Sequence, residues 1–467
     1  MSEARAIARR AVAELASREP GLLQIDGIDL GTALEQQLFF AVRDGRAAPS
    51  SSRARLAGIG RLAGASLVAV GNALRARRAR GAPVVLVREV VHEEVVAAVN
   101  RHLVTFGSAP LAVVRVGRAA ARGGERLVDQ LDARLLAALW RHQLGSFRRL
   151  SSATRGWPVP LGGVAAVELP RIALGAAALA CLTRRRSPSV LVAFDEVGTW
   201  ARLLPAVAAR HRTPSLDLPH AEAADPSAIA GAGYDRMAVY GPLAAARLEE
   251  AGIDPRRIVV IGAPRFDALM DAGPPATAGS ARVVFAAQYV AGSMTAAGLE
   301  ACHRAALAAA GALAPSELLV VPHPAEPPGT IAAIVARHPA PPGVRVMVDR
   351  PGGLHEALRG ARLLVTGWSN SIFEAVLLGV PSIAVDTDGR APMDLAAEGL
   401  ATRVASPDEA SRAATTLDQP EARAAALAHA RAALPRHLGP LDGRAAERAA
   451  RLILELAAGS AAGAAAA

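Results

Sequence analysis

The sequence predicts an α/β protein of two Rossmann-like, doubly wound domains that face each other across a cleft. Three observations lead to this fold class. The chain has 467 residues, more than a single hydrophobic core usually supports. Short apolar, β-branched runs alternate with segments of helix length, a rhythm typical of βαβ units and parallel sheets. A stretch of glycine, proline and small residues at 271–280 divides this rhythm into two series and is interpreted as a linker.

The first series begins with helices and continues as alternating strands and helices. Residues 4–18 and 32–43 have helical patterns, and the segment 123–182 is mostly helical as well. Inside that segment, the uncharged run 172–182 is too short to span a bilayer and predicts a buried helix. Strands are expected at 83–88, 111–116, 190–194, 215–218, 236–240 and 258–261, with helices at 199–210 and 243–251.

The second series repeats the alternation and ends in helices. Strands are expected at 283–286, 318–321, 345–348, 363–366 and 382–385, and helices at 295–313, 354–360 and 371–378. After Pro407 the pattern is helical, and the last residues are an alanine-rich tail. We therefore expect an N-terminal, acceptor-side domain with a helical extension at 1–275, a nucleotide-binding domain at 281–418, C-terminal helices at 419–458 and a disordered tail at 459–467.

The charge balance limits the classes of partner. The formal net charge is +10, all basic residues are arginine, and they gather at 53–55, 75–80 and 184–186. Such segments suit nucleic acid, anionic lipid or an acidic substrate, or they are simply solvated. The chain has 4 Trp, 3 Tyr and 8 Phe, and none of them alternates with arginine as base-stacking surfaces require. We expect no nucleic acid partner and keep an anionic membrane surface as a candidate.

Cysteines and known motifs point to a cytoplasmic protein that uses no cofactor. The two cysteines, Cys181 and Cys302, lie far apart, and the first residues carry acidic side chains with no apolar leader. A cytoplasmic location follows, with a peripheral position on the inner membrane face as the variant that the basic segments allow. Phosphate-loop, zinc-protease and calcium-loop patterns are missing from the sequence. We therefore expect catalysis without a protein-bound metal.

Two strand ends of the first series carry candidate catalytic side chains. Ligands of open α/β sheets bind beyond the carboxyl ends of the strands. Asp195 and Glu196 directly follow the strand 190–194 and could supply a general base, or Asp195 could cap the next helix. His220 follows the strand 215–218, where it could exchange a proton near neutral pH, hold a phosphate or be structural.

A third strand end holds a histidine between two prolines. Pro322, His323 and Pro324 follow the strand 318–321. Proline fixes the backbone and removes amide donors, so the imidazole is held rigidly. A rigid imidazole suits a phosphate contact or proton delivery to a leaving group, and simple turn formation is the competing interpretation.

The fourth strand end has the most specific pattern. Small and polar residues connect the strand 363–366 to the following helix; they are Gly367, Ser369, Asn370 and Ser371. At a helix N-terminus such residues present N–H groups and the positive end of the dipole to an anion. Ordinary capping would give the same pattern. Glu374 could complete a capping box with Ser371, or it could bind a ribose diol.

Together, these strand ends resemble a family of GT-B-fold proteins that make bacterial surface and capsular polysaccharides. The family is similar to CDP-glycerol glycerophosphotransferases, metal-independent bacterial sialyltransferases and, more distantly, UDP-GlcNAc 2-epimerases. The resemblance covers roughly residues 189–385 and rests on the stretches FDEVGTWARLLPAVAARHRTPSLDLPHAEA, DRMAVYGPLAAARLEEAGIDPRRIVVIGAPRFDAL, LLVVPHP and LLVTGWSNSIFEAVLLGVPSIAV. The family usually has Gln-His-Gly around His220, where this chain has Pro219 and Ala221.

The resemblance implies a glycosyltransferase that moves a sugar from a CMP- or UDP-linked donor to a surface-polysaccharide or glycolipid acceptor. It implies a donor site of Pro324, Gly367, Ser369, Asn370, Ser371 and Glu374, and catalytic candidates Asp195, Glu196, His220 and His323. The two serines and Asn370 would hold the donor phosphates, and Glu374 would contact ribose or a backbone amide. His323 would stabilise the leaving phosphate. Asp195 or Glu196 would deprotonate the acceptor hydroxyl, with His220 as the competing base.

Three alternatives stay open. A transferase using a CDP-alcohol would employ the same phosphate site, pass a polyol phosphate to the acceptor and release CMP. A UDP-GlcNAc 2-epimerase-like enzyme is the second, although its expected run of two glycines and two glutamates near Ser371 is replaced by SNSIFEA. The third is a non-catalytic GT-B module that binds nucleotide, which the departures at Pro219 and Ala221 favour.

Overall fold

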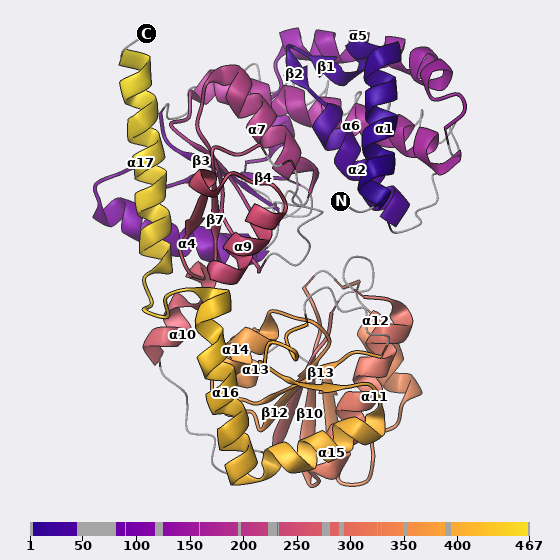
Figure 1. Cartoon of the computed structure of the whole chain (residues 1–467), viewed down its shortest axis with the longest axis vertical. Coiled ribbons are helices and arrows are strands. Elements are labelled where there is room, and N and C mark those ends of the chain that lie inside the picture. The colour runs from indigo at the N-terminus through magenta and orange to yellow at the C-terminus, as the bar shows by residue number, and fades with distance from the viewer. Residues whose placement is uncertain are drawn as a thin grey trace. The chain divides into compact units, whose positions relative to one another are not determined.

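The computed structural model describes two compact units, each built on a parallel sheet (Figure 1). The described residues are 3–43, 81–88, 90–116, 125–157, 159–194, 198–222, 231, 233–272, 281–288, 294–324, 326–327, 329–348, 353–387 and 394–465. The N-terminal unit comprises Met1–Val239, Ala244–Arg265 and Ala446–Ala467, and the C-terminal unit comprises Tyr240–Leu243 and Phe266–Ala445. The prediction of two doubly wound α/β domains is confirmed.

The sheet of the N-terminal unit has six parallel strands. They are β3 (Val84–Val87), β4 (Ala112–Arg115), β5 (Leu191–Ala193), β6 (Ser215–Asp217), β7 (Arg236–Val239) and β8 (Ile258–Val260). Their order is β4-β3-β5-β6-β7-β8, with parallel pairing throughout. The direction of winding reverses between β3 and β5, which makes their carboxyl ends a switch point. Every strand predicted for this series is present.

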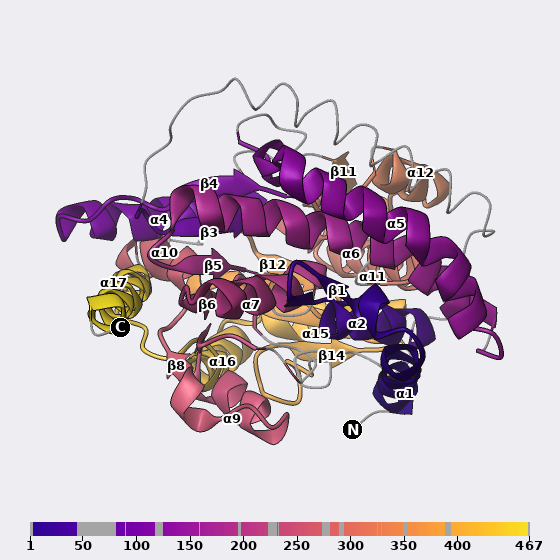
Figure 2. The same ribbon diagram turned by 90° about the horizontal axis from the view of Figure 1, so that it is seen from above.

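Helices cover this sheet and build a helical subdomain beside it. They are α1 (Glu3–Arg18), α2 (Gly31–Arg43), α4 (Val90–Thr105), α5 (Ala133–Ala153), α6 (Val159–Arg186), α7 (Thr199–His211), α9 (Pro242–Glu250) and α17 (Ala445–Ala465). Short elements complete the unit: β1 (Gln24–Ile25), β2 (Ile28–Asp29), η1 (Pro20–Leu23), η3 (Leu127–Gln130), η4 (Pro255–Arg257) and η5 (Pro264–Phe266). Seen from above, the long helices α5 and α6 run side by side (Figure 2).

Helix α6 contains the buried helix predicted at 172–182. Ile172, Leu179 and Leu182 are fully buried in the core of the N-terminal unit. By length and composition the stretch Leu161–Arg186 could also cross a membrane, and it is the one such helix in the described part of the chain. Two thirds of its apolar window (67%) is buried inside the protein, as in a core helix of a folded domain.

The C-terminal unit has the second six-stranded parallel sheet. Its strands are β9 (Arg282–Ala286), β10 (Ser316–Val321), β11 (Val344–Val348), β12 (Leu363–Thr366), β13 (Ser382–Val385) and β14 (Thr402–Val404), in the order β11-β10-β9-β12-β13-β14. Its helices are α10 (Asp267–Ala272), α11 (Ala296–Ala312), α12 (Thr330–Arg337), α13 (Leu354–Leu358), α14 (Ser371–Leu377), α15 (Pro407–Asp418) and α16 (Pro420–Leu438). The switch point of this sheet lies between β9 and β12.

The end of the chain differs from the sequence-based boundaries. The helices predicted as one segment at 419–458 divide, because α16 belongs to the C-terminal unit and α17 to the N-terminal unit. Helix α17 also continues to Ala465, through most of the tail predicted to be disordered from residue 459. Alanine has the highest helix propensity of all residues, so the alanine-rich end prolongs the helix. Of the linker predicted at 271–280, residues 273–280 lie outside the described residues.

Candidate functional site

At the switch point of the C-terminal sheet, two strand ends are joined by side-chain hydrogen bonds. Gln288 follows β9 and is 7% exposed; its Nε2 donates to the carbonyl oxygen of Trp368 at 2.7 Å. The hydroxyl of Thr366, in β12, donates to the carbonyl oxygen of Ala286 at 2.8 Å. Sequence reasoning did not identify Gln288, although its place just after a strand would have marked it.

Gly367 lets these two strand ends approach each other. A Cβ atom at this position would lie 2.3 Å from Oε1 of Gln288 and 2.5 Å from Cε of Met294. Real Cβ atoms essentially never show contacts under 3.0 Å. A side chain at this position would therefore force the ends of the Gln288 and Met294 side chains to move, and the Gln288 side chain is bonded to the loop that follows β12.

The loop after Gly367 turns directly into α14. The backbone N–H of Ser371 donates to Oγ of Ser369 at 3.2 Å, and those of Ile372 and Phe373 donate to the carbonyl oxygens of Ser369 and Asn370 at 3.1 and 3.0 Å. Asn370 is the N-cap of α14, so Ser371 is not the N-cap and the capping box considered from sequence is not formed. The Ser371 hydroxyl is buried, at 4% exposure, and has no hydrogen-bond partner among the described residues.

Glu374 is buried one turn into α14. It is 1% exposed, and its Oε2 lies 3.1 Å from Nε2 of His355, in α13. A buried carboxylate is costly unless a partner compensates its charge, and the His355 imidazole is such a partner when it is protonated. His355 was not predicted, since a single histidine in a short helix has no special pattern.

His323 lies on the same edge of the sheet. It follows β10, whose last residue Val321 is paired with Ala286 of β9. The imidazole is half-buried, and Pro324 is exposed. The structure thus places His323 and Pro324 after β10, and Gly367, Ser369, Asn370 and Ser371 after β12, on the same carboxyl edge of the sheet with β9 between the two strands.

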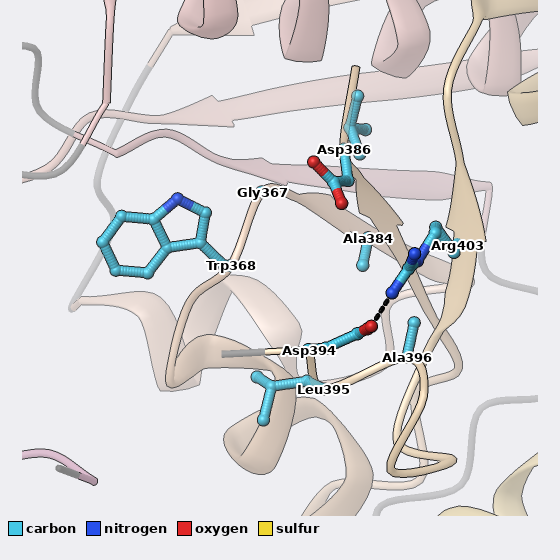
Figure 3. Close-up of a pocket in the computed structure, with 9 residues that line it drawn as sticks. Gly367, Trp368, Ala384, Asp386, Asp394, Leu395, Ala396 and Arg403 are labelled. Carbon is cyan, nitrogen blue, oxygen red and sulfur yellow. Dashed lines mark ion pairs between the residues drawn. The ribbon is translucent and has the colours of Figure 1, made fainter. Parts of the chain in front are cut away.

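A shallow, partly open pocket adjoins this loop. It is lined by Gly367, Trp368, Ala384, Val385, Asp386, Asp394, Leu395, Ala396 and Arg403 (Figure 3). Arg403, in β14, forms an ion pair with Asp394. The polar residues of this pocket were not predicted, although Asp386 directly follows the strand predicted at 382–385.

In the N-terminal unit, His220 lies against a second histidine. The ring centroids of His220 and His92 are 4.8 Å apart in an edge-on arrangement, and His92 stacks on Phe194 at 4.9 Å. His92 lies in the first turn of α4 and is fully buried, whereas His220 is half-buried. The other two residues predicted here, Asp195 and Glu196, lie outside the described residues.

The environment of His92 keeps its imidazole neutral. Burial, assisted by the nearby charges of His220 and Arg88, lowers the pKa of His92 to about 2. The backbone N–H of Arg88 donates to Nδ1 at 3.3 Å, so the proton of the neutral ring is on Nε2. His92 is therefore no general base near neutral pH. It was missed from sequence, although it follows the predicted strand at 83–88 by one helical turn.

The basic segment 184–186 is largely neutralised by acidic partners. Arg184 pairs with Asp26 at 3.1 Å and with Asp132 at 3.0 Å, and Arg186 pairs with Glu125 at 2.5 Å. These arginines connect parts of the N-terminal unit. The other basic segments, 53–55 and 75–80, lie outside the described residues. Within the described ranges, no three His, Cys, Asp or Glu side chains are grouped as metal ligands would be.

Comparison with known proteins places the chain among two-domain α/β structures. No protein-family profile matches the chain, and no curated protein matches its sequence. Solved structures are similar: UDP-GlcNAc 2-epimerase from Neisseria meningitidis bound to UDP-GlcNAc has 14% identity and a TM-score of 0.51, over 80% of this chain and 100% of the other. The UDP-GlcNAc 2-epimerase from Methanocaldococcus jannaschii has 12% identity and a TM-score of 0.50, over 80% and 99%.

A third structure, of a protein assigned as a UDP-N-acetylglucosamine 2-epimerase from Listeria monocytogenes, has 13% identity and a TM-score of 0.52, over 79% of this chain and 94% of the other. At identities this low the likeness establishes the fold and leaves the reaction open. The chain has a two-domain α/β fold of the GT-B type.

Proposed function

We propose that the chain binds a nucleotide-activated sugar at the carboxyl edge of its C-terminal sheet and transfers the sugar to an acceptor. The observation that carries this proposal is the position of the loop from Gly367 to Ser371, which crosses the switch point and is held against Gln288. Ligands of open α/β sheets bind at this place in the fold. A similar fold has been solved with UDP-GlcNAc bound, which supports a uridine nucleotide as the first donor to test.

In this proposal the loop residues hold the donor phosphates. Ser369, Asn370 and Ser371 lie where β12 passes into α14, and a bound phosphate would give the buried Ser371 hydroxyl a hydrogen-bond partner. His323, at the end of β10 on the far side of β9, would stabilise the leaving phosphate. Glu374 holds α14 to α13 through His355, and a contact with ribose stays a prediction.

The pocket beside the loop would take the sugar. The Asp386 carboxylate, which lines the pocket, can accept hydrogen bonds from sugar hydroxyl groups. The acceptor, a glycan or lipid-linked glycan, and a peripheral location at the inner membrane are parts of the proposal that rest on the sequence resemblance. The base that activates the acceptor is likewise predicted to be Asp195, Glu196 or His220.

Epimerisation of UDP-GlcNAc is the second candidate, because the three similar structures are described as 2-epimerases. The two activities differ in whether they need an acceptor and in whether the nucleotide is released. An epimerase converts UDP-GlcNAc without an acceptor and keeps the nucleotide linked to the product, whereas a transferase releases the nucleotide when an acceptor is present. Incubation of the protein with UDP-GlcNAc alone, followed by analysis of the sugar, separates them.

The first test is thermal unfolding of the whole chain with CMP, CDP, UMP, UDP, GDP and ADP. A nucleotide at about a hundred times its Kd should stabilise the protein by roughly 2.7 kcal/mol. Ser371→Ala should weaken binding of the best nucleotide by about 1–2 kcal/mol, as for a lost hydrogen bond to a charged group. Unchanged affinity in Ser371→Ala would contradict the phosphate assignment, and no stabilisation by any nucleotide would contradict the proposed function.

Ser382→Ala is the matched control. Ser382 is also a serine with 4% exposure and a hydroxyl without a hydrogen-bond partner among the described residues. It lies at the amino end of β13, however, away from the edge where the loop lies. Its replacement should leave nucleotide affinity unchanged.

A further inference from the structure

The pocket beside the loop is lined by more acidic than basic side chains. Two of its residues, Asp386 and Asp394, are acidic, and one, Arg403, is basic. Arg403 is paired with Asp394, while no ion pair or hydrogen bond of the Asp386 carboxylate is found among the described residues. The segment 388–393 between them carries one aspartate and one arginine in the sequence, so it adds no net charge.

Asp386 is held in a partly apolar environment, where water screens the charge of its carboxylate less than at an open surface. Its backbone N–H donates to the carbonyl oxygen of Val404 at 2.9 Å, which fixes the residue at the end of β13. The residue is half-buried, and Ala384, Val385 and Leu395 line the pocket near it. Figure 3 shows the carboxylate on the side of Gly367, with the ion pair of Arg403 on the other side of Ala384. Apolar walls reduce the screening of a charge by water.

We propose that Asp386 restricts this pocket to donors with an uncharged sugar. Its carboxylate accepts hydrogen bonds from sugar hydroxyls, and it repels a sugar that carries a carboxylate of its own. The selected class is therefore neutral hexoses and N-acetylhexosamines, and uronic and sialic acids are disfavoured. The inference rests on the proposed function, because it places the donor sugar in the pocket. Specificity here comes from a repulsive group as well as an attractive one.

The test compares UDP-glucose with UDP-glucuronic acid, measured by calorimetry on the whole chain. The two donors share the nucleotide and the ring configuration, and they differ at C6, a hydroxymethyl group in one and a carboxylate in the other. UDP-glucose should bind about tenfold more tightly, or more, as repulsion between like charges in a partly apolar site predicts. Asp386→Asn should bring the two affinities within about threefold, mainly through tighter binding of UDP-glucuronic acid.

Two further variants make the result specific. Arg403→Gln removes the partner of Asp394, makes the pocket more negative and should increase the preference for UDP-glucose. This opposite effect keeps the inference testable if Asp386→Asn does not fold. Asp408→Asn makes the same chemical change in the first turn of α15, outside the pocket, and should leave the ratio of affinities unchanged.

The outcomes separate this inference from the proposed function. If UDP and both sugar nucleotides bind, and the two donors bind equally or Asp386→Asn leaves their ratio unchanged, the assignment of Asp386 is overturned and the nucleotide site stands. If UDP binds and neither sugar nucleotide does, the pocket does not take the sugar. If UDP, UDP-glucose and UDP-glucuronic acid all fail to bind, the proposed use of a uridine donor fails together with the inference.

Discussion

At the scale of single residues, the loop that follows β12 depends on the absence of a side chain at Gly367. Gly367→Ala would place a Cβ 2.3 Å from Oε1 of Gln288, whose Nε2 is bonded to the Trp368 carbonyl. Relief of this contact requires the Gln288 side chain or the loop to move. Because the side-chain ends can shift, we expect Gly367→Ala to lower the free energy of unfolding by about 0.5–1.5 kcal/mol, the contribution of the Gln288 hydrogen bond that the shift disturbs, and to weaken nucleotide binding. Urea unfolding and calorimetry measure the two effects.

Gly459→Ala is the control for this substitution. Gly459 lies in α17, and a Cβ there would meet no atom within 4 Å. The only expected effect is the gain in helix propensity, up to about 1 kcal/mol in the stabilising direction. A loss of stability in Gly459→Ala as large as that in Gly367→Ala would show that the cost at Gly367 does not come from its close contacts.

His303 makes the stability of the C-terminal unit depend on pH. It is fully buried in α11, and neither ring nitrogen has a hydrogen-bond partner among the described residues. Burial, with a smaller effect of the nearby His338, lowers the pKa of His303 to about 4. Above about pH 6.5 the ring is neutral in the folded and unfolded chain, so it contributes no pH dependence there. Between pH 6.5 and 4 the unfolded chain takes up a proton that the folded chain does not, so stability falls as the pH falls.

We expect this effect to lower the free energy of unfolding by roughly 2–3 kcal/mol between pH 6.5 and 4. His303→Leu removes the titrating group and the two buried nitrogens, so it should be about as stable as the natural chain at pH 7.5 and clearly more stable at pH 4.5. Denaturant unfolding of both proteins at several pH values measures the difference, in which the effects of all other titrating groups cancel. A difference that stays constant with pH would contradict the low pKa.

Site residues were predicted correctly where their position directly after a strand is enough to place them on the edge of the sheet. His323 and Gly367 to Ser371 follow apolar runs of clear strand character, so the rule for parallel sheets places them on one edge. Gln288, His355 and His92 were not predicted, because their roles come from contacts with residues distant in the sequence. The contact of His92 with His220, for example, depends on β3, β5 and β6 being neighbours in the sheet.

At the scale of elements, the close packing of α6 against α7 depends on Gly175. A Cβ at Gly175 would lie 2.8 Å from Cη2 of Trp200 and 3.2 Å from Cδ1 of Leu203. In Gly175→Ala two effects compete: helix propensity stabilises by about 1 kcal/mol, and overpacking of the helix contact costs about 1–3 kcal/mol. Because the tight contact is with a large ring in a packed core, we expect net destabilisation, measured by urea unfolding.

A second substitution tests whether the contact with Trp200 causes the destabilisation expected in Gly175→Ala. Trp200→Leu removes the ring that the new methyl group would meet, so Gly175→Ala should cost less in this background than in the natural chain. The coupling free energy of the double-mutant cycle should be at least 0.5 kcal/mol, as for residues in contact. Additive effects would mean that Gly175 is needed for another reason than its contact with Trp200.

Elements with strong patterns were predicted, and short ones with weak patterns were not. The central strands of both sheets, such as β3, β5, β12 and β13, are buried throughout, so they form continuous apolar runs that are visible in the sequence. Strand β14, Thr402–Val404, lies at the sheet edge and has one buried residue of three, so it has no such run. Helix α12 buries Ile331 and Ile334, a helical spacing that is too short to stand out between glycine and proline.

At the scale of the whole molecule, the chain leaves the N-terminal unit and returns to it. The last segment, Ala446–Ala467, belongs to the N-terminal unit after some 180 residues of the C-terminal unit. Leu452 and Ile453 of α17 are buried in one apolar cluster with Val85 of β3 and Val192 of β5. The sequence could not predict this return, because an amphipathic helix near the end of a chain fits either sheet equally well.

Deletion of residues 446–467 should therefore destabilise the N-terminal unit. Burial of a side chain such as Leu452 or Ile453 contributes about 1.5–3 kcal/mol each, and Arg448 adds a hydrogen bond from its Nε to the carbonyl oxygen of Ile261 at 2.6 Å. The sum is comparable to the 5–15 kcal/mol that typically stabilises a whole domain. We expect the N-terminal unit to unfold at a much lower denaturant concentration in the shortened chain.

Intrinsic fluorescence can follow this unit, because three of the four tryptophans, Trp140, Trp157 and Trp200, belong to it. Deletion of residues 460–467 alone is the control: the residues of α17 in the apolar cluster end at Ala457, so the core stays covered. The short deletion should leave the unfolding midpoint of the tryptophan signal close to that of the full chain, while the long deletion lowers it. Equal midpoints for the long deletion and the full chain would show that α17 contributes little to the N-terminal core, and that this core is complete without the returning helix.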